Sequence, residues 1–191
     1  MKKNFWKTLV GTWNTKTVVG VAIGAALFGV LMVFGSIKVF TNTNLTTAML
    51  VSVIVGAMFG PLPAMVAAGV GNVLADLIGG WGMWFDWSIG NAFLGLFVGA
   101  LPLYGAKIEE GSFNVKHMII YIIMCILGNA LAFGVITPIF STIIYGSELT
   151  ITLMQSLAGS ISNCAVLIII GIPLLQLLAA RNARKSNLTK E

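Results

Sequence analysis

Charged residues are scarce in this chain. Only 9% of its 191 residues are Asp, Glu, Lys or Arg, whereas a soluble domain carries about 25%. So few charges cannot cover the surface of a soluble fold of this size, which excludes an ordinary soluble enzyme. The mean hydropathy of +0.96 indicates a protein whose solvent is lipid. The formal net charge of +5 therefore bears on membrane orientation, not on nucleic acid.

Motifs for catalysis and metal binding are missing as well. The two cysteines, Cys125 and Cys164, lie in apolar runs and form no CxxC pair, and the single histidine is His117. The sequence contains no G-x-x-x-x-G-K-[ST], no G-x-S-x-G and no H-E-x-x-H. We therefore expect no catalytic residue, no bound metal and no cofactor, and the chain itself should not hydrolyse nucleotide.

Long apolar runs fill the rest of the chain. A helix needs roughly 20 apolar residues to cross a bilayer. The pattern predicts an all-α integral membrane fold with six transmembrane helices in one domain, residues 17–180. The predicted spans are residues 17–37, 45–60, 62–79, 88–105, 116–140 and 150–180, and Pro173 should kink the last one. Residues 1–16, which are aromatic and basic, should lie at the membrane interface, and residues 181–191 form a basic tail.

The basic residues predict the orientation of these spans. Six spans place both termini, residues 60–63 and residues 106–115 on one side, and residues 38–44, 80–87 and 141–149 on the other. Lys38 is the one basic residue on the second side. The first side holds ten: Lys2, Lys3, Lys7, Lys16, Lys107, Lys116, Arg181, Arg184, Lys185 and Lys190. Because basic loops stay in the cytoplasm, both termini should be cytoplasmic.

Aromatic residues concentrate in the predicted outer loop 80–87. Trp81, Trp84, Phe85 and Trp87 lie there beside Asp86, between flexible glycines. Such residues form either an interfacial aromatic belt or a lid that stacks over a planar or apolar ligand.

Polar side chains inside the predicted spans indicate a cavity. Asp76 stands one helical turn after Asn72, and a charge inside a span usually faces a cavity or a partner. Asn91, Asn129, Gln155 and Asn163 also fall within spans, where amides either bond neighbouring helices or line a site. Together they favour an outer cavity for a neutral, hydrogen-bonding solute. The candidate ligand residues are Asn72, Asp76, Trp81, Trp84, Phe85, Trp87, Asn91, Asn129 and Asn163.

Three stretches of the sequence resemble a known family. They are residues 16–28, with small residues four apart, residues 56–61 (Gly-Ala-Met-Phe-Gly-Pro), and residues 71–76 (Gly-Asn-Val-Leu-Ala-Asp). About residues 15–180 resemble the S-components of energy-coupling factor (ECF) transporters, the substrate-binding membrane subunits of bacterial vitamin importers. Within the riboflavin-type subgroup, the chain is most similar to the cobalamin S-component. It departs from the commoner subgroup pattern at Asn72, where His is expected, and lacks a Lys just before Asp76.

The resemblance implies a function. The chain would be a multi-pass protein of the bacterial cell membrane that is not an enzyme. It would capture a vitamin, cobalamin or alternatively riboflavin, and associate with a transmembrane coupling protein and two ATPases. ATP hydrolysis by these partners would topple it in the membrane and release the solute inside. The implied docking surface is the small-residue face of the first span: Gly20, Ala22, Gly24, Ala26 and Val30. The spacing alone is equally consistent with packing of that face inside the molecule. The alternative functional class is a stand-alone secondary carrier.

Cysteine labelling tests the predicted topology. Lys3→Cys and Lys185→Cys should react with an impermeant reagent from the cytoplasmic side only, and Trp84→Cys from the outside only. Labelling of position 84 from the cytoplasm would contradict six spans with cytoplasmic termini.

Overall fold

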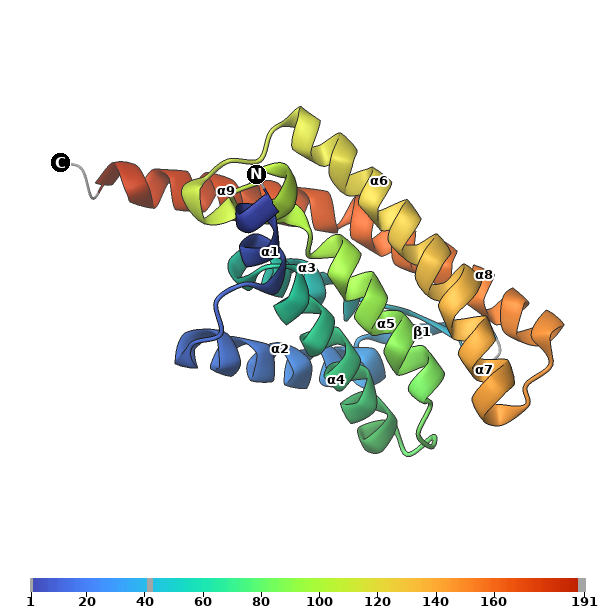
Figure 1. Ribbon diagram of the computed structural model, residues 1–191. Coiled ribbons are helices and arrows are strands. Elements are labelled where there is room, and N and C mark those ends of the chain that lie inside the picture. Colours follow the sequence, from blue (N-terminus) through green and yellow to red (C-terminus); the bar gives the residue numbers. More distant parts are fainter. Residues whose placement is uncertain (1, 41–42, 189–191) are drawn as a thin grey trace.

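Helices make up most of the chain in the computed structural model, which describes residues 2–40 and 43–188 (Figure 1). The short 3₁₀ turns are η1, Leu101–Tyr104, and η2, Ile108–Glu110, and a π-helical segment, η3, spans Ala132–Ile136. The helices and strands are α1 Lys2–Val10, α2 Thr15–Phe34, β1 Ser36–Phe40, β2 Thr43–Thr46, α3 Met49–Phe59, α4 Pro61–Gly79, α5 Phe85–Val98, α6 Val115–Leu131, α7 Thr137–Tyr145, α8 Leu149–Ile169 and α9 Gly171–Leu188.

Five helical segments in the described part are long and apolar enough to cross a membrane. They are Thr15–Phe34, Pro61–Gly79, Phe85–Tyr104, Val115–Tyr145 and Leu149–Arg184. The predicted span 45–60 is shorter than expected, because its helical part, α3, has 11 residues. At 1.5 Å per residue such a helix covers only about half of the hydrocarbon core. Six full spans therefore stay a prediction, as does the cytoplasmic placement of the termini.

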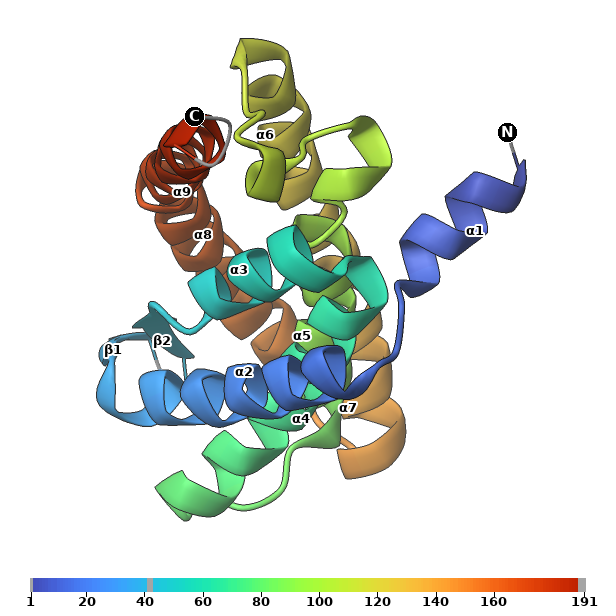
Figure 2. The same ribbon diagram turned by 90° about the vertical axis from the view of Figure 1, so that its left-hand side faces the viewer.

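A two-stranded β-hairpin, which the sequence did not predict, interrupts an otherwise helical membrane fold. β1 and β2 pair antiparallel, with Ser36 opposite Thr46 and Ile37 opposite Leu45. This region was predicted to be the end of a span followed by a loop, but its Ile, Val, Phe and Thr residues favour strands. The hairpin lies near the end of α2 and beside α8 (Figure 2). Residues 41 and 42 of the predicted loop lie outside the described residues, as do 189–191 of the predicted tail.

The two longest helical segments carry internal irregularities at their prolines. α6, η3 and α7 form one continuous run in which Pro138 follows the π-helical turn. α8 ends at Ile169 and α9 begins at Gly171. Pro173 has no N–H to donate to the carbonyl of Ile169, so the ladder is interrupted there. The predicted kink near Pro173 is therefore confirmed as a break between two helices.

Small residues bring α2, α3, α4 and α5 into close contact. A Cβ atom on Gly71 would lie 2.6 Å from the Cβ of Phe28, and one on Gly95 would lie 2.7 Å from the carbonyl oxygen of Ala64. Such positions let helix backbones approach closely, which is how helices associate where lipid provides no hydrophobic drive.

The predicted docking face on α2 divides into two parts. A Cβ on Gly20 would overlap the ring of Phe59, and one on Gly24 would lie 2.7 Å from the side chain of Val55. These two glycines therefore pack inward against α3, which accounts for their spacing. Ala22, Ala26 and Val30 are exposed. Of the five residues predicted to form the docking surface, these three are therefore the ones that a partner could contact on α2.

The segments predicted to share one side of the membrane come together at one end of the molecule. Asn182 on α9 donates a hydrogen bond to the carbonyl of Ile108, 3.0 Å away. A Cβ on Gly11 would lie 2.6 Å from the carbonyl oxygen of Phe59. α1, the α3–α4 turn, η2 and α9 therefore meet there. The turn between α4 and α5 and the end of α7 lie at the opposite end (Figure 1). We call it the outer end because the basic residues predict that it faces the outside.

Candidate functional site

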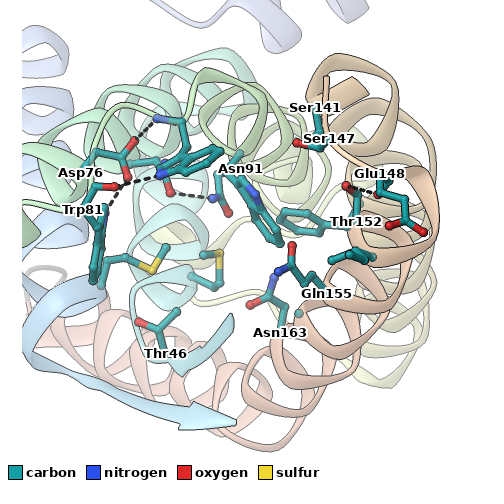
Figure 3. Close-up of a pocket in the computed structure, with 18 residues that line it drawn as sticks. Thr46, Asp76, Trp81, Asn91, Ser141, Ser147, Glu148, Thr152, Gln155 and Asn163 are labelled. Carbon is teal, nitrogen blue, oxygen red and sulfur yellow. Dashed lines mark hydrogen bonds between the residues drawn. The ribbon is translucent and has the colours of Figure 1, made fainter. Parts of the chain in front are cut away.

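A cavity of about 600 Å³ opens at the outer end, within the size range of pockets that hold small ligands. Its walls come from α4, α5 and α8, with contributions from α2, β2, α3, η3 and α7 (Figure 3). Seven of the nine predicted ligand residues line it: Asn72, Asp76, Trp81, Trp84, Trp87, Asn91 and Asn163. The structure thus brings together residues that lie up to 91 positions apart, from Asn72 to Asn163.

Two predicted ligand residues do not line the cavity. Asn129 is buried on α6, and its Nδ2 donates to the carbonyl of Cys125 at 2.9 Å, so this donor is satisfied within its own helix. Phe85 is half exposed, and its backbone N–H donates to the hydroxyl of Tyr145 at 2.9 Å. Phe85 and Trp87 begin helix α5, so the predicted loop 80–87 is shortened to a turn of residues 80–84, the α4–α5 turn.

Asp76 holds the α4–α5 turn in place. Its Oδ1 accepts a hydrogen bond from Trp81 Nε1 and its Oδ2 accepts one from the backbone N–H of Trp84, both at 2.8 Å. Hydrogen bonds to a charged group contribute about 1.5–3 kcal/mol each, more than neutral ones. Gly80 and Gly82, with φ of 65° and 93°, supply the left-handed conformations that bring the turn back over the carboxylate. The acid predicted to face a cavity thus also fixes the tryptophans that cover it.

Tyr145 at the end of α7 fastens the same turn from the other side. Its hydroxyl donates to the carbonyl of Met83 at 2.9 Å while accepting from the N–H of Phe85, and its ring centroid lies 5.0 Å from that of Trp84. Sequence reasoning missed this residue, because nothing in the local pattern links positions 60 residues apart.

A directed chain of hydrogen bonds joins α4 to α5 beneath the turn. Ser88 Oγ donates to the carbonyl of Trp84, which can only accept, at 3.2 Å. Asn72 Nδ2 donates to Ser88 Oγ at 3.0 Å, and Asn91 Nδ2 donates to Asn72 Oδ1 at 2.8 Å. Because the Trp84 carbonyl can only accept, each donor in this series of hydrogen bonds is determined. The series therefore fixes the orientation of the side-chain amides of Asn72 and Asn91.

The wall formed by α8 is more extensive than predicted. Five lining residues lie along one helical face at spacings of three or four: Glu148, Thr152, Gln155, Gly159 and Asn163. Only Asn163 was in the predicted ligand set, although this polar stripe on an apolar helix was a readable signal. The other lining residues that were not predicted are Met32, Thr46, Met49, Phe133, Ser141, Ser147 and Ile151. They come from distant segments and carry no common sequence pattern.

Three comparisons identify related proteins. The family model described as "ECF-type riboflavin transporter, S component" matches residues 12–180. A UPF0397 protein of Vibrio vulnificus is 36% identical over 180 residues, covering 93% of this chain and 98% of the relative. A UPF0397 protein of Aliivibrio fischeri is 34% identical, covering 93% and 97%. The crystal structure of FolT bound with folic acid shares the fold, with a TM-score of 0.62 at 17% identity, over 88% of this chain and 96% of FolT.

Replacing Tyr145 by Phe tests how the α4–α5 turn is held. The variant loses both hydroxyl hydrogen bonds, each contributing about 1 kcal/mol, so opening of the turn should become at least about fivefold more frequent. Hydrogen exchange of the amides of residues 83–85 measures this. Tyr104→Phe is the control, because the buried Tyr104 hydroxyl has no partner among the described residues. Unchanged exchange in Tyr145→Phe would contradict the proposed role.

Proposed function

The chain belongs to the family of ECF-type riboflavin transporter S components, and from this premise we propose that it captures a vitamin in the cavity beneath the α4–α5 turn. It is a multi-pass bacterial membrane protein and a non-enzymatic subunit of a transporter. In the proposed cycle it binds the vitamin from outside, docks on a transmembrane coupling protein, and releases the vitamin inside when two ATPases hydrolyse ATP.

The observation that carries the proposal is the combination of groups in the cavity. Trp81, Trp84 and Trp87 offer aromatic faces for stacking, and the amides of Asn91 and Asn163 offer hydrogen bonds. A large apolar pocket with a few polar groups is typical of sites for small organic solutes.

Cobalamin is the vitamin we propose first. It combines a broad ring plane with a fringe of amides, which suits the tryptophans and the asparagine side chains of the wall. The resemblance to the cobalamin S-component CbrT and the departure from the commoner subgroup pattern at Asn72 support the same choice. Riboflavin is the alternative, and the cavity volume favours it: riboflavin can be enclosed in about 600 Å³, whereas cobalamin would extend through the cavity mouth.

A stand-alone secondary carrier is a weaker candidate. Proton- or ion-coupled carriers usually need a chain of ionisable groups through the membrane. Asp76 is the acid predicted inside a span, and its two oxygens are engaged in holding the α4–α5 turn. Uptake that depends on co-expressed ATPases distinguishes the two classes.

Isothermal titration of the purified chain tests the ligand. Cobalamin should bind tightly and riboflavin weakly or not at all; heat from riboflavin alone would overturn the choice. Trp84→Ala should weaken binding of the true ligand at least tenfold, about 1.4 kcal/mol, because it removes the indole but keeps the backbone N–H bonded to Asp76. Trp13→Ala, an exposed tryptophan between α1 and α2, is the control. If both variants bind like the wild type, the tryptophans of the turn are only an interfacial belt.

Bulky substitutions on α2 test the docking surface. Ala22→Trp together with Ala26→Trp places two indoles on an exposed face and should prevent co-purification with the coupling protein, while vitamin binding stays intact. Ile119→Trp with Ile123→Trp on α6 is the matched control, since both isoleucines are about half exposed and also four residues apart. Normal co-purification of the α2 variant would show that the partner docks elsewhere.

A further inference from the structure

Among the described residues, the two charged side chains that line the cavity are both acidic. Asp76 comes from α4 and Glu148 from the start of α8, and they stand at opposite sides of the cavity in Figure 3. Asp86, in the first turn of α5, is completely buried next to the lining residue Trp87 and does not itself line the cavity. Two acidic side chains therefore border the cavity.

The described basic side chains lie far from these acids along the molecule. Lys7 is on α1 and Lys16 at the start of α2, while Lys107 precedes η2 and forms an ion pair with Glu110 at 2.8 Å. Lys116 starts α6, and Arg181 and Arg184 stand on the last turns of α9. Among the basic residues whose side chains the structure describes, which do not include Lys38 of β1, none neighbours the acids at the cavity.

An unpaired amide points to the solute as the missing partner. Asn163 is only 5% exposed and lines the cavity, yet its side chain has no hydrogen-bond partner among the described residues. A buried polar group without a partner costs free energy, so this position is built for a group that arrives with the ligand. Trp81, Trp87 and Phe133 also line the cavity, and their ring faces attract positive charge.

We propose that the cavity selects its solute by charge: it binds a form with no net negative charge, whose N–H donors or positive charge face Asp76 and Glu148, and it rejects the form that has gained a phosphate or carboxylate. The physical cause is that carboxylates at the edge of a low-dielectric cavity repel an entering anion strongly. This inference rests on the proposed function, because it concerns the solute of the same cavity.

Matched pairs of vitamins test the inference in a thermal-shift and titration panel on the purified full chain. The pairs are riboflavin and riboflavin 5′-phosphate, cyanocobalamin and a monocarboxylic acid of cyanocobalamin, thiamine and thiamine monophosphate, and nicotinamide and nicotinate. In whichever pair shows binding, the less negative member should bind at least tenfold more tightly than the more acidic member. Equal or tighter binding of the acidic member would overturn the inference while leaving vitamin capture intact. No binding by any member would contradict the proposed function itself.

Two charge-neutralising variants separate electrostatics from shape. Glu148→Gln should reduce the discrimination within the pair at least threefold, measured as the ratio of the two affinities in the same variant. Glu109→Gln removes an exposed acid at the opposite end of the molecule and should leave the discrimination unchanged. A discrimination that survives unchanged in Glu148→Gln would overturn the electrostatic cause, because shape alone would then reject the anion.

Discussion

The carboxylate of Asp76 is the group on which the outer end of the molecule depends. An acid near the end of a membrane helix must find partners, and here it finds two N–H donors on the turn that follows its own helix. That solution folds the turn back over α4 and places Trp81 and Trp84 at the cavity. Tyr145 holds the other edge of the turn, and the series of hydrogen bonds from Asn91 to the carbonyl of Trp84 links α5 to α4 beneath it. Burial of one charge thus organises the roof and one wall of the site.

Helix packing explains why the cavity is at this end. Glycine and alanine let α2, α4 and α5 approach closely along their length, as at Gly71 against Phe28. α8 approaches the hairpin, and its inward face near the outer end carries polar residues instead of large apolar ones. Close packing on one side and a polar face on the other leave a space that protein side chains do not fill. A solute held there would contact α4 and α5 on one side and α8 on the other.

Much of this arrangement could be predicted from the sequence. The scarcity of charge gave the membrane class, and Asp76, Asn72 and the tryptophans were recognised because polar and aromatic residues are conspicuous in an apolar chain. The hairpin was missed because its strand-forming residues are also apolar enough to continue a span. Asn129 was misplaced because sequence places a residue in a helix without giving the direction in which its side chain points. Tyr145 and Thr46 contribute through tertiary contacts with no local signal. The inward packing of Gly20 and Gly24 shows the same limit: their spacing is identical for an internal and an external helix partner.

The central claim is that the solute binds in the cavity between the α4–α5 turn and α8. A crystal or cryo-EM structure of the chain with the vitamin identified by titration tests it most directly. The account predicts ring density against the indoles of Trp81, Trp84 and Trp87, with a polar edge of the solute within hydrogen-bond distance of Asn163. Density for the solute at any other place, with the cavity empty and the turn unchanged, would contradict it.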